Sequence, residues 1–231
     1  FRVGPDPQFP PRLGDDIFFN GDGMATRFLF ADGKVSLRQR YICTDKFVAE
    51  EKAGHALFGA YRNPFTDDPS VAGMIRGTAN TNIVWHGGKL LALKEDSPPV
   101  AMDPWTMETH GNWTFDGRLS SRTFTAHPHI DPDTGEMLCF GYAATGEATD
   151  DVAYYVVDRH GKVIHETWFK VPYSGMLHDF GVSKNYVIFP VVPITSSIDY
   201  LKAGRPHFLW DPSKDVWLGV LPRYGTAADL R

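Results

Sequence analysis

Two short histidine segments hold the side chains best suited to bind a metal ion. The first, residues 125–131, contains His127 and His129, and the second, residues 176–180, contains His178. Neutral imidazole nitrogen binds iron, copper, nickel and zinc, and distant segments supply ligands to one ion only where the fold brings separate strands together. Nine histidines are present, so residue type and spacing by themselves leave an ordinary hydrogen-bonded or surface role open.

The residues around these histidines leave two further questions open. A strand would direct His127 and His129 towards the same face, because residues two apart share a side, so the pattern does not choose between them. Asp179 directly follows His178. Its carboxylate is suited either to orient a metal-bound ring or to bond to neighbouring backbone groups.

Composition restricts the class of protein and the kind of partner. The chain has 231 residues, 42% of them hydrophobic and 22% charged, with a net charge of −5, which is enough for a globular protein with a substantial core. The pI near 6.0 and the absence of a long basic run argue against nucleic acid or an anionic membrane as the main partner. No apolar stretch approaches the roughly 18 residues that span a bilayer.

The two cysteines indicate a reducing compartment. Cys43 and Cys139 have no metal-site spacing and do not form a disulfide framework. We therefore expect a cytoplasmic protein. Cys139 lies in the apolar run 137–140 and is predicted to be a small buried residue.

Short alternating segments separated by turn residues predict β-hairpins along the chain. The hairpins pair residues 27–30 with 35–41, 83–85 with 89–93, 129–130 with 138–140, 153–157 with 163–168, 180–182 with 186–189, and 208–210 with 216–220. A helical turn is predicted at residues 46–52, after the cap residues Thr44 and Asp45. Residues 1–23, rich in Pro, Gly and Asp, are predicted to be loop, with 16–19 as a short extended piece.

These elements predict an all-β fold of short antiparallel strands. A sandwich, a barrel and a propeller all fit the pattern, and the pattern does not choose among them. No linker, low-complexity segment or charge run divides the chain, so a single domain over residues 1–231 is expected.

Seven motifs follow one another along the chain. They are RVGPDP at 2–7, NGDGM at 20–24, NTN at 80–82, LLALKE at 90–95, AHP at 126–128, HDF at 178–180 and GVLPR at 219–223. At these residues the chain resembles the carotenoid cleavage oxygenase family, and more closely its lignostilbene dioxygenase branch. The resemblance runs essentially end to end. It implies a seven-bladed β-propeller with long loops over an axial site, where four histidines hold a non-haem Fe(II), and it implies that the chain is truncated at both ends.

The resemblance also implies which histidines bind the iron. The family places a ligand in Ala-His-Pro, so His127 and His178 would be the first two ligands, while His129 would have a structural or supporting role. The third and fourth ligands are expected beyond Arg231. An all-histidine site leaves the iron without carboxylate charge and keeps an open coordination position for O₂ beside the organic substrate. The other six histidines, His55, His86, His110, His160, His165 and His207, are expected at the surface.

Resemblance to the lignostilbene branch places Phe19, Tyr61 and Lys94 at the substrate pocket. Relatives that act on carotenoids more often carry tryptophan at the position of Lys94. A buried ammonium favours the phenolate form of a phenol, whose ordinary pKa is about 10, and Tyr61 can donate a second hydrogen bond to the same oxygen. The phenolate makes the conjugated alkene electron-rich towards dioxygen, and Phe19 would stack on an aromatic ring. Alternatively, Lys94 and Glu95 form a surface ion pair, and Phe19 and Tyr61 are core aromatics.

The first hypothesis is therefore an Fe(II)-dependent dioxygenase. It would cleave the central double bond of a hydroxylated, lignin-derived stilbene with O₂ and release two aromatic aldehydes. Two alternatives stay open: an oxygenase that cleaves an apocarotenoid or carotenoid, and a non-catalytic propeller fragment that binds an aromatic ligand or a protein. With two of four ligands, the isolated chain is expected to hold iron poorly. The preferred stilbene and the oligomeric state, including a homodimer, are not determined by the sequence.

Overall fold

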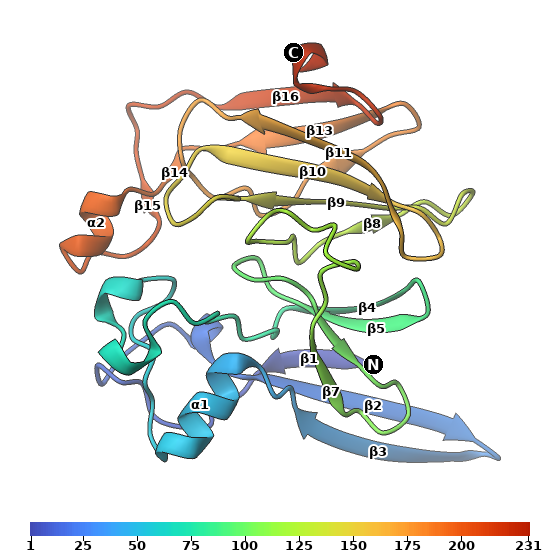
Figure 1. Ribbon diagram of the computed structural model, residues 1–231, viewed down its shortest axis with the longest axis vertical. Helices are drawn as coiled ribbons and strands as arrows, with labels where there is room; N and C mark the ends of the chain where they lie inside the picture. The colour runs from blue at the N-terminus through green and yellow to red at the C-terminus, as the bar shows by residue number, and fades with distance from the viewer. The chain divides into compact units, whose positions relative to one another are not determined.

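Strands make up most of the regular elements in the computed structural model, which describes residues 1–231 (Figure 1). Sixteen strands are accompanied by two α-helices and four short 3₁₀ helices, so the all-β class is confirmed. Contacts divide the chain into two compact units, Phe1–Trp85 with Lys89–Trp113, and His86–Gly88 with Thr114–Arg231. The single domain expected from the sequence stays a prediction.

The first sheet of unit 1 contains the long hairpin seen in blue in Figure 1. Strand β2 (Gly23–Ala31) pairs with β1 (Arg2–Pro5) on one side and with β3 (Lys34–Tyr41) on the other, all antiparallel. Asp32 and Gly33 connect β2 to β3 with φ angles of 50° and 69°. A two-residue turn of this hand requires positive φ at both positions, which explains why Asp-Gly predicted this hairpin correctly.

The second sheet of unit 1 has the order β4-β5-β6-β7, with β4 at Asn82–His86, β5 at Lys89–Leu93, β6 at Val100–Met102 and β7 at Thr109–Asn112. The predicted hairpin around Gly87 and Gly88 is confirmed by β4 and β5. Strand β5 is almost entirely buried. Its apolar residues pack with those of β1, β2 and β6 in one core that includes Val3, Ala25, Leu90, Ala92, Val100 and Met102. This core fixes the end of β5, where Lys94 follows.

The longer helix, α1 (Asp45–Ala53), begins and ends where its sequence indicates. The Oγ1 atom of Thr44 accepts a hydrogen bond from Phe47 N at 3.2 Å, and Gly54 ends the helix with φ of 75°. The predicted helical turn is therefore confirmed. The second helix, α2 (Ile198–Lys202), was not predicted because five residues carry too little periodicity. Neither helix, nor any other in the structure, combines the length and apolar character needed to cross a membrane.

Unit 2 contains three sheets. The first has the order β11-β10-β9-β8, the second β12-β13-β16, and the third pairs β14 with β15. The strand bounds are β8 His129–Ile130, β9 Met137–Tyr142, β10 Asp151–Val157, β11 Val163–Lys170, β12 Gly181–Val182, β13 Tyr186–Val191, β14 Ile194–Thr195, β15 Leu209–Trp210 and β16 Trp217–Pro222. Five of these nine strands, β9, β10, β11, β13 and β16, contribute buried apolar residues to one core. The hairpins predicted at β8–β9, β10–β11 and β12–β13 are confirmed, and Cys139 is fully buried as expected.

Two local predictions were wrong. The strands near 208–210 and 216–220 exist, but they do not pair with each other: β15 pairs with β14, and β16 pairs with β13. The N-terminal segment is not all loop, because Arg2–Pro5 forms β1, and Phe18–Asn20 is a 3₁₀ turn rather than extended chain. The strand pairings depend on partners outside the local segment, about which a local pattern carries no signal.

The surface prediction was also wrong for two histidines in unit 2. His86 is buried, with Nε2 lying 3.2 Å from the carbonyl oxygen of Gly135, and burial lowers its pKa. His207 is buried as well, with Nδ1 3.8 Å from a carboxylate oxygen of Glu147. Each ring is held by a residue distant in sequence, which the polar sequence around it did not reveal.

Candidate functional site

The rings of His127 and His178 meet in unit 2. Their Nε2 atoms lie 3.1 Å apart, and the rings are edge to face with centroids separated by 4.5 Å. Two neutral imidazoles at this distance form one N–H···N hydrogen bond. The same separation is short enough for both nitrogens to bind a single cation, since metal–imidazole bonds are about 2.1 Å long. The donor set therefore fits a shared metal ion, and the assignment of the two rings as ligands stays a prediction.

The backbone on either side of the two rings is anchored in unit 2. Thr125 N donates to Phe140 O at 2.6 Å, and the hydroxyl of Thr125 accepts from His127 N at 3.0 Å. Met176 N donates to Ile194 O at 2.9 Å. Because these bonds join each histidine segment to a strand, the ring positions follow from the sheets rather than from loose loops.

His129 connects the two histidine segments from the side. Its Nε2 atom lies 3.0 Å from Phe180 O, and its ring packs edge-on against the Phe180 ring at 4.9 Å. The Asp179 carboxylate accepts from Phe180 N at 2.8 Å and lies 3.6 Å from His129 Nε2. Both residues thus have local bonding roles, which agrees with the structural role predicted for His129 and with the backbone role that was left open for Asp179.

Phe19, Tyr61 and Lys94 come together in unit 1. Lys94 Nζ donates to Phe19 O at 2.9 Å and lies 5.0 Å from the centre of the Tyr61 ring. The rings of Phe19 and Tyr61 are edge to face with centroids 6.4 Å apart. Three residues separated by as many as 75 positions therefore form one cluster, which we call the phenol cluster.

Burial tests the alternative roles of Lys94 and Phe19. The Lys94 side chain is only 5% exposed and Glu95 is equally buried, so the surface ion pair is wrong. Phe19 is 52% exposed, so it is not a core aromatic in this unit. The substrate-pocket role of Phe19, Tyr61 and Lys94 stays a prediction.

The electrostatics of the phenol cluster follow from the same burial. Burial lowers the pKa of Lys94, although the carboxylates of Asp96 and Glu95 oppose the shift. Burial raises the pKa of Tyr61, although the positive charge of Arg62 opposes this shift. Tyr61 therefore keeps its proton at neutral pH and can donate a hydrogen bond. Lys94 has three N–H donors, and its one hydrogen bond within the chain goes to Phe19 O, which leaves two for a ligand.

Asp16 supports the phenol cluster, and the sequence analysis did not assign it a role. Its Oδ1 atom accepts from Tyr61 N at 3.2 Å, and its Oδ2 atom accepts from Asn20 Nδ2 at 2.6 Å. Asn20 Nδ2 also donates to Gly59 O at 3.0 Å. These bonds join the turn that carries Phe19 to the loop that carries Tyr61. No sequence signal was available, because the partners of the two side chains include main-chain atoms.

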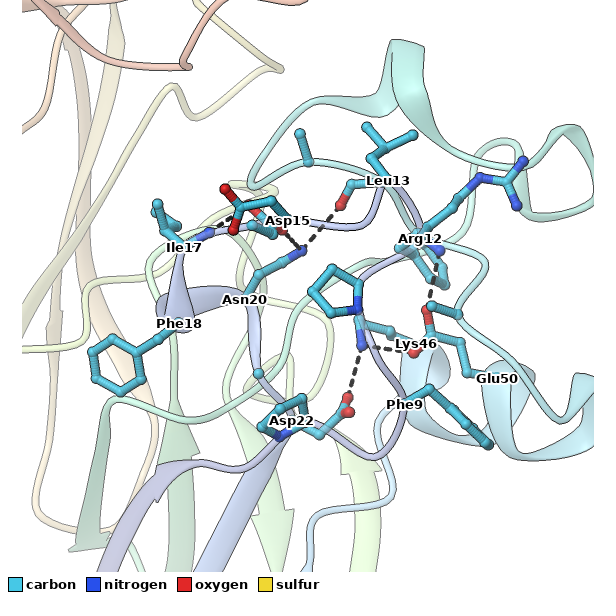
Figure 2. Close-up of a pocket in the computed structure, with 18 residues that line it drawn as sticks. Phe9, Arg12, Leu13, Asp15, Ile17, Phe18, Asn20, Asp22, Lys46 and Glu50 are labelled. Carbon is cyan, nitrogen blue, oxygen red and sulfur yellow. Dashed lines mark hydrogen bonds and ion pairs between the residues drawn. The ribbon is translucent and has the colours of Figure 1, made fainter.

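A cavity of about 220 Å³ lies behind the same turn, beside α1 (Figure 2). Its wall includes the apolar side chains of Phe9, Leu13, Ile17, Phe18 and Phe58. Lys46 Nζ contacts Asp22 Oδ1 at 2.9 Å and Glu50 Oε2 at 2.7 Å, as Figure 2 shows. The remaining carboxylate oxygens accept backbone N–H groups, from Gln8 for Asp22 and from Leu57 and Phe58 for Glu50. These charges are therefore fully paired and anchor the turn to α1.

Comparisons with known proteins match the whole chain. The family model for the retinal pigment epithelial membrane protein (RPE65) matches residues 1–231. Lignostilbene-α,β-dioxygenase isozyme III from Sphingomonas paucimobilis is 59% identical over 222 residues, which cover 96% of this chain and 45% of that protein. Isoeugenol monooxygenase from Pseudomonas putida is 52% identical over 231 residues, covering 100% of this chain and 48% of that protein.

A solved structure agrees with these matches. The crystal structure of Pseudomonas brassicacearum lignostilbene dioxygenase superposes with a TM-score of 0.96 at 52% identity, over 100% of this chain and 48% of that one. The chain thus spans about half the length of the relatives that it matches. The likeness therefore concerns the part of those proteins that corresponds to residues 1–231.

Proposed function

Because the chain belongs to the retinal pigment epithelial membrane protein family, the carotenoid cleavage oxygenases with non-haem iron, we propose that this protein is an Fe(II)-dependent dioxygenase acting on hydroxylated stilbenes. It cleaves the central carbon–carbon double bond with O₂ and releases two aromatic aldehydes. The observation that carries the proposal is the buried ammonium of Lys94 beside Tyr61 and Phe19. A fully apolar polyene has no group that would pair with this cation.

The names of the similar proteins support this substrate class. Lignostilbene and isoeugenol, named in the two relatives, are both phenols that carry a conjugated double bond. A pocket for such a molecule needs a polar end for the phenol oxygen and an aromatic wall for the ring. The phenol cluster supplies both within unit 1.

We propose that Lys94 and Tyr61 bind the phenol oxygen of the substrate. One of the two remaining N–H groups of Lys94 and the protonated hydroxyl of Tyr61 donate to that oxygen. Two donors, one of them charged, stabilise the phenolate form, and the negative charge then spreads through the conjugated ring onto the alkene. The exposed Phe19 ring packs against the substrate ring and orients it, for roughly 0.5–1.5 kcal/mol beyond its area burial.

We propose that His127 and His178 hold the Fe(II). Their Nε2 atoms are 3.1 Å apart and form a neutral, all-nitrogen donor pair of the kind that iron accepts. When bound by these histidines, the iron would supply the chemistry that activates dioxygen. We propose that two further histidines outside residues 1–231 complete the ligand set, in a seven-bladed propeller.

The test is aldehyde release from 4-hydroxystilbene and from its 4-methoxy analogue by Fe(II)-loaded protein expressed from the complete reading frame. The proposal expects cleavage of the hydroxy compound alone, because a methyl ether cannot form a phenolate. Cleavage of both compounds would contradict phenolate activation by Lys94 and Tyr61. Cleavage of neither, together with turnover of an apocarotenoid, would favour the carotenoid-cleaving alternative. Aromatic binding without turnover of any alkene would favour a non-catalytic role.

A further inference from the structure

Asn80 and Lys94 share one hydrogen-bond acceptor. Asn80 Nδ2 donates to Phe19 O at 2.8 Å and to Gly21 O at 2.6 Å, and Lys94 Nζ donates to the same Phe19 O at 2.9 Å. Asn80 is 3% exposed. A carbonyl oxygen has two lone pairs, so these two side chains use its full capacity.

The β4–β5 hairpin places the two donors together. Thr81 N donates to Leu93 O at 3.0 Å, so the residues before and after this bond, Asn80 and Lys94, lie at the same end of the hairpin. Phe19 comes from a turn about sixty residues earlier than Asn80. The end of this hairpin therefore binds that turn through the main-chain oxygens of Phe19 and Gly21, and Phe19 O is the one that Asn80 and Lys94 share.

The other side of the same turn is held independently. Asp16 accepts from Tyr61 N, and Asn20 donates to Gly59 O. Loss of the Asn80 side chain would leave these bonds in place. The Tyr61 side of the phenol cluster would stay ordered, and the Lys94 side would lose the group that fixes its acceptor.

We propose that Asn80 is a positioning residue that sets the preference of the site for a free phenolic hydroxyl, by holding the Phe19 carbonyl to which the Lys94 ammonium is bound. One N–H of Lys94 points at this carbonyl, so the position of the carbonyl determines where the other two N–H groups point. The inference rests on the proposed function, in which one of those groups donates to the phenol oxygen. It assigns Asn80 no contact with the substrate.

A purely structural role for Asn80 makes a different prediction. If Asn80 only stabilises unit 1, its loss lowers stability and weakens all ligands alike. If it positions Lys94, its loss weakens ligands with a phenolic hydroxyl and leaves methyl ethers nearly unaffected. The ratio of two affinities therefore separates the roles.

The experiment measures equilibrium binding of 4-hydroxystilbene and 4-methoxystilbene to the iron-free protein from the complete reading frame, by fluorescence titration at pH 7. Asn80→Ala removes both N–H groups of the Asn80 side chain. Asn80→Asp also removes them but preserves the volume of the side chain, in case the smaller alanine prevents folding. Thr44→Ala is the matched control, because it removes the cap of α1 in the same unit and touches none of the phenol cluster. A urea melt of each variant reports its stability.

We expect the preference for the hydroxy ligand to fall roughly tenfold in Asn80→Ala, which is the size of one hydrogen bond to a charged group, and at least as much in Asn80→Asp. Thr44→Ala should keep the wild-type ratio despite its lower stability. Asn80 variants that keep the wild-type ratio would overturn the inference while leaving the proposed function intact. A wild-type protein that binds both ligands equally would overturn the proposed function, and the inference with it.

Discussion

The Nε2 atom of His129 lies 3.0 Å from the carbonyl oxygen of Phe180, and this contact joins the segment of His127 to the segment of His178. The Phe180 ring packs at 5.0 Å from Phe140 and at 5.7 Å from Phe189 in the core of unit 2. His129 therefore connects the segments of both proposed ligands to the packed core of unit 2. Residues of this kind determine how well a metal site is formed before the metal arrives.

The first prediction concerns His129. Replacement by alanine should lower the iron affinity of the protein by about 10- to 100-fold, as is usual for residues that orient metal ligands, because the His178 segment loses its link to the His127 segment. His55→Ala is the control, since the exposed His55 ring hydrogen-bonds to the nearby carbonyl oxygen of Ala53. Iron content after dialysis against a weak chelator is the measurement. Equal iron retention in His129→Ala and His55→Ala would show that the link is dispensable.

The second prediction concerns the cost of burying Lys94. Burial lowers its pKa in the folded state, so the unfolded chain binds more protons than the folded one between the lowered pKa and the ordinary value of about 10.4. The folded state therefore bears the full cost of the charge at pH values below the lowered pKa. The cost is relieved as the pH rises through this window.

Lys94→Met removes the charge and keeps the length of the side chain. Phe19 O retains its bond from Asn80, so no buried acceptor is left unpaired. The variant should be more stable than the wild type at pH 7, and the difference should shrink towards pH 10. Its cleavage of 4-hydroxystilbene should fall by about 100-fold or more, as expected for a charged donor to the reacting group. Urea unfolding at the two pH values and aldehyde release check both parts, and a variant less stable at pH 7 would contradict the first.

Much of the fold could be predicted because the deciding signals are local. Asp32-Gly33 and Gly87-Gly88 adopt positive φ in tight turns, and each is flanked by alternating residues, so both hairpins follow from neighbouring positions. The partner of β16 is β13, and nothing near residue 217 specifies it. Long-range register depends on which apolar faces meet in the core, which a single segment does not encode.

In the candidate site, too, some features could be predicted from the sequence and others could not. Residue type and the resemblance identified His127, His178, Phe19, Tyr61 and Lys94, and the structure brings them into one pair and one cluster. The supporting contacts were not predictable, because Lys94 and Asn80 bind the main-chain oxygen of Phe19. A backbone carbonyl is present at every residue and carries no sequence signal.

The third prediction concerns the protonation state of Tyr61. Burial raises the pKa of Tyr61 above its ordinary value near 10. The hydroxyl therefore stays protonated throughout the range from about pH 6 to about pH 9. Tyr61→Phe should lower kcat/KM for 4-hydroxystilbene by about tenfold, the usual effect of one lost hydrogen bond. The pH–rate profile should keep its shape, because Tyr61 does not titrate in that range. Disappearance of an alkaline limb in the variant would instead identify Tyr61 as an ionising group.

The last prediction concerns the buried ion pairs of Lys46 with Asp22 and Glu50, which anchor the turn of Phe19 to α1. Lys46 lies between Asp22 and Glu50, and its side chain is only 7% exposed. Lys46→Met leaves two buried carboxylates without a cation, and such a loss costs about 3–5 kcal/mol in the free energy of unfolding. Lys52 lies in the last turn of the same helix and is exposed, so Lys52→Met should leave the free energy nearly unchanged.

Asp22 lies two residues after Asn20, so the Lys46 variant should affect the phenol cluster as well as stability. We expect weaker binding of both 4-hydroxystilbene and 4-methoxystilbene, because the turn as a whole loosens and the aromatic wall moves with it. Urea unfolding and fluorescence titration of the two lysine variants provide the measurements. If Lys46→Met unfolded at the same urea concentration as Lys52→Met, the carboxylates would have to be solvated in the folded protein, and the anchor would lie elsewhere.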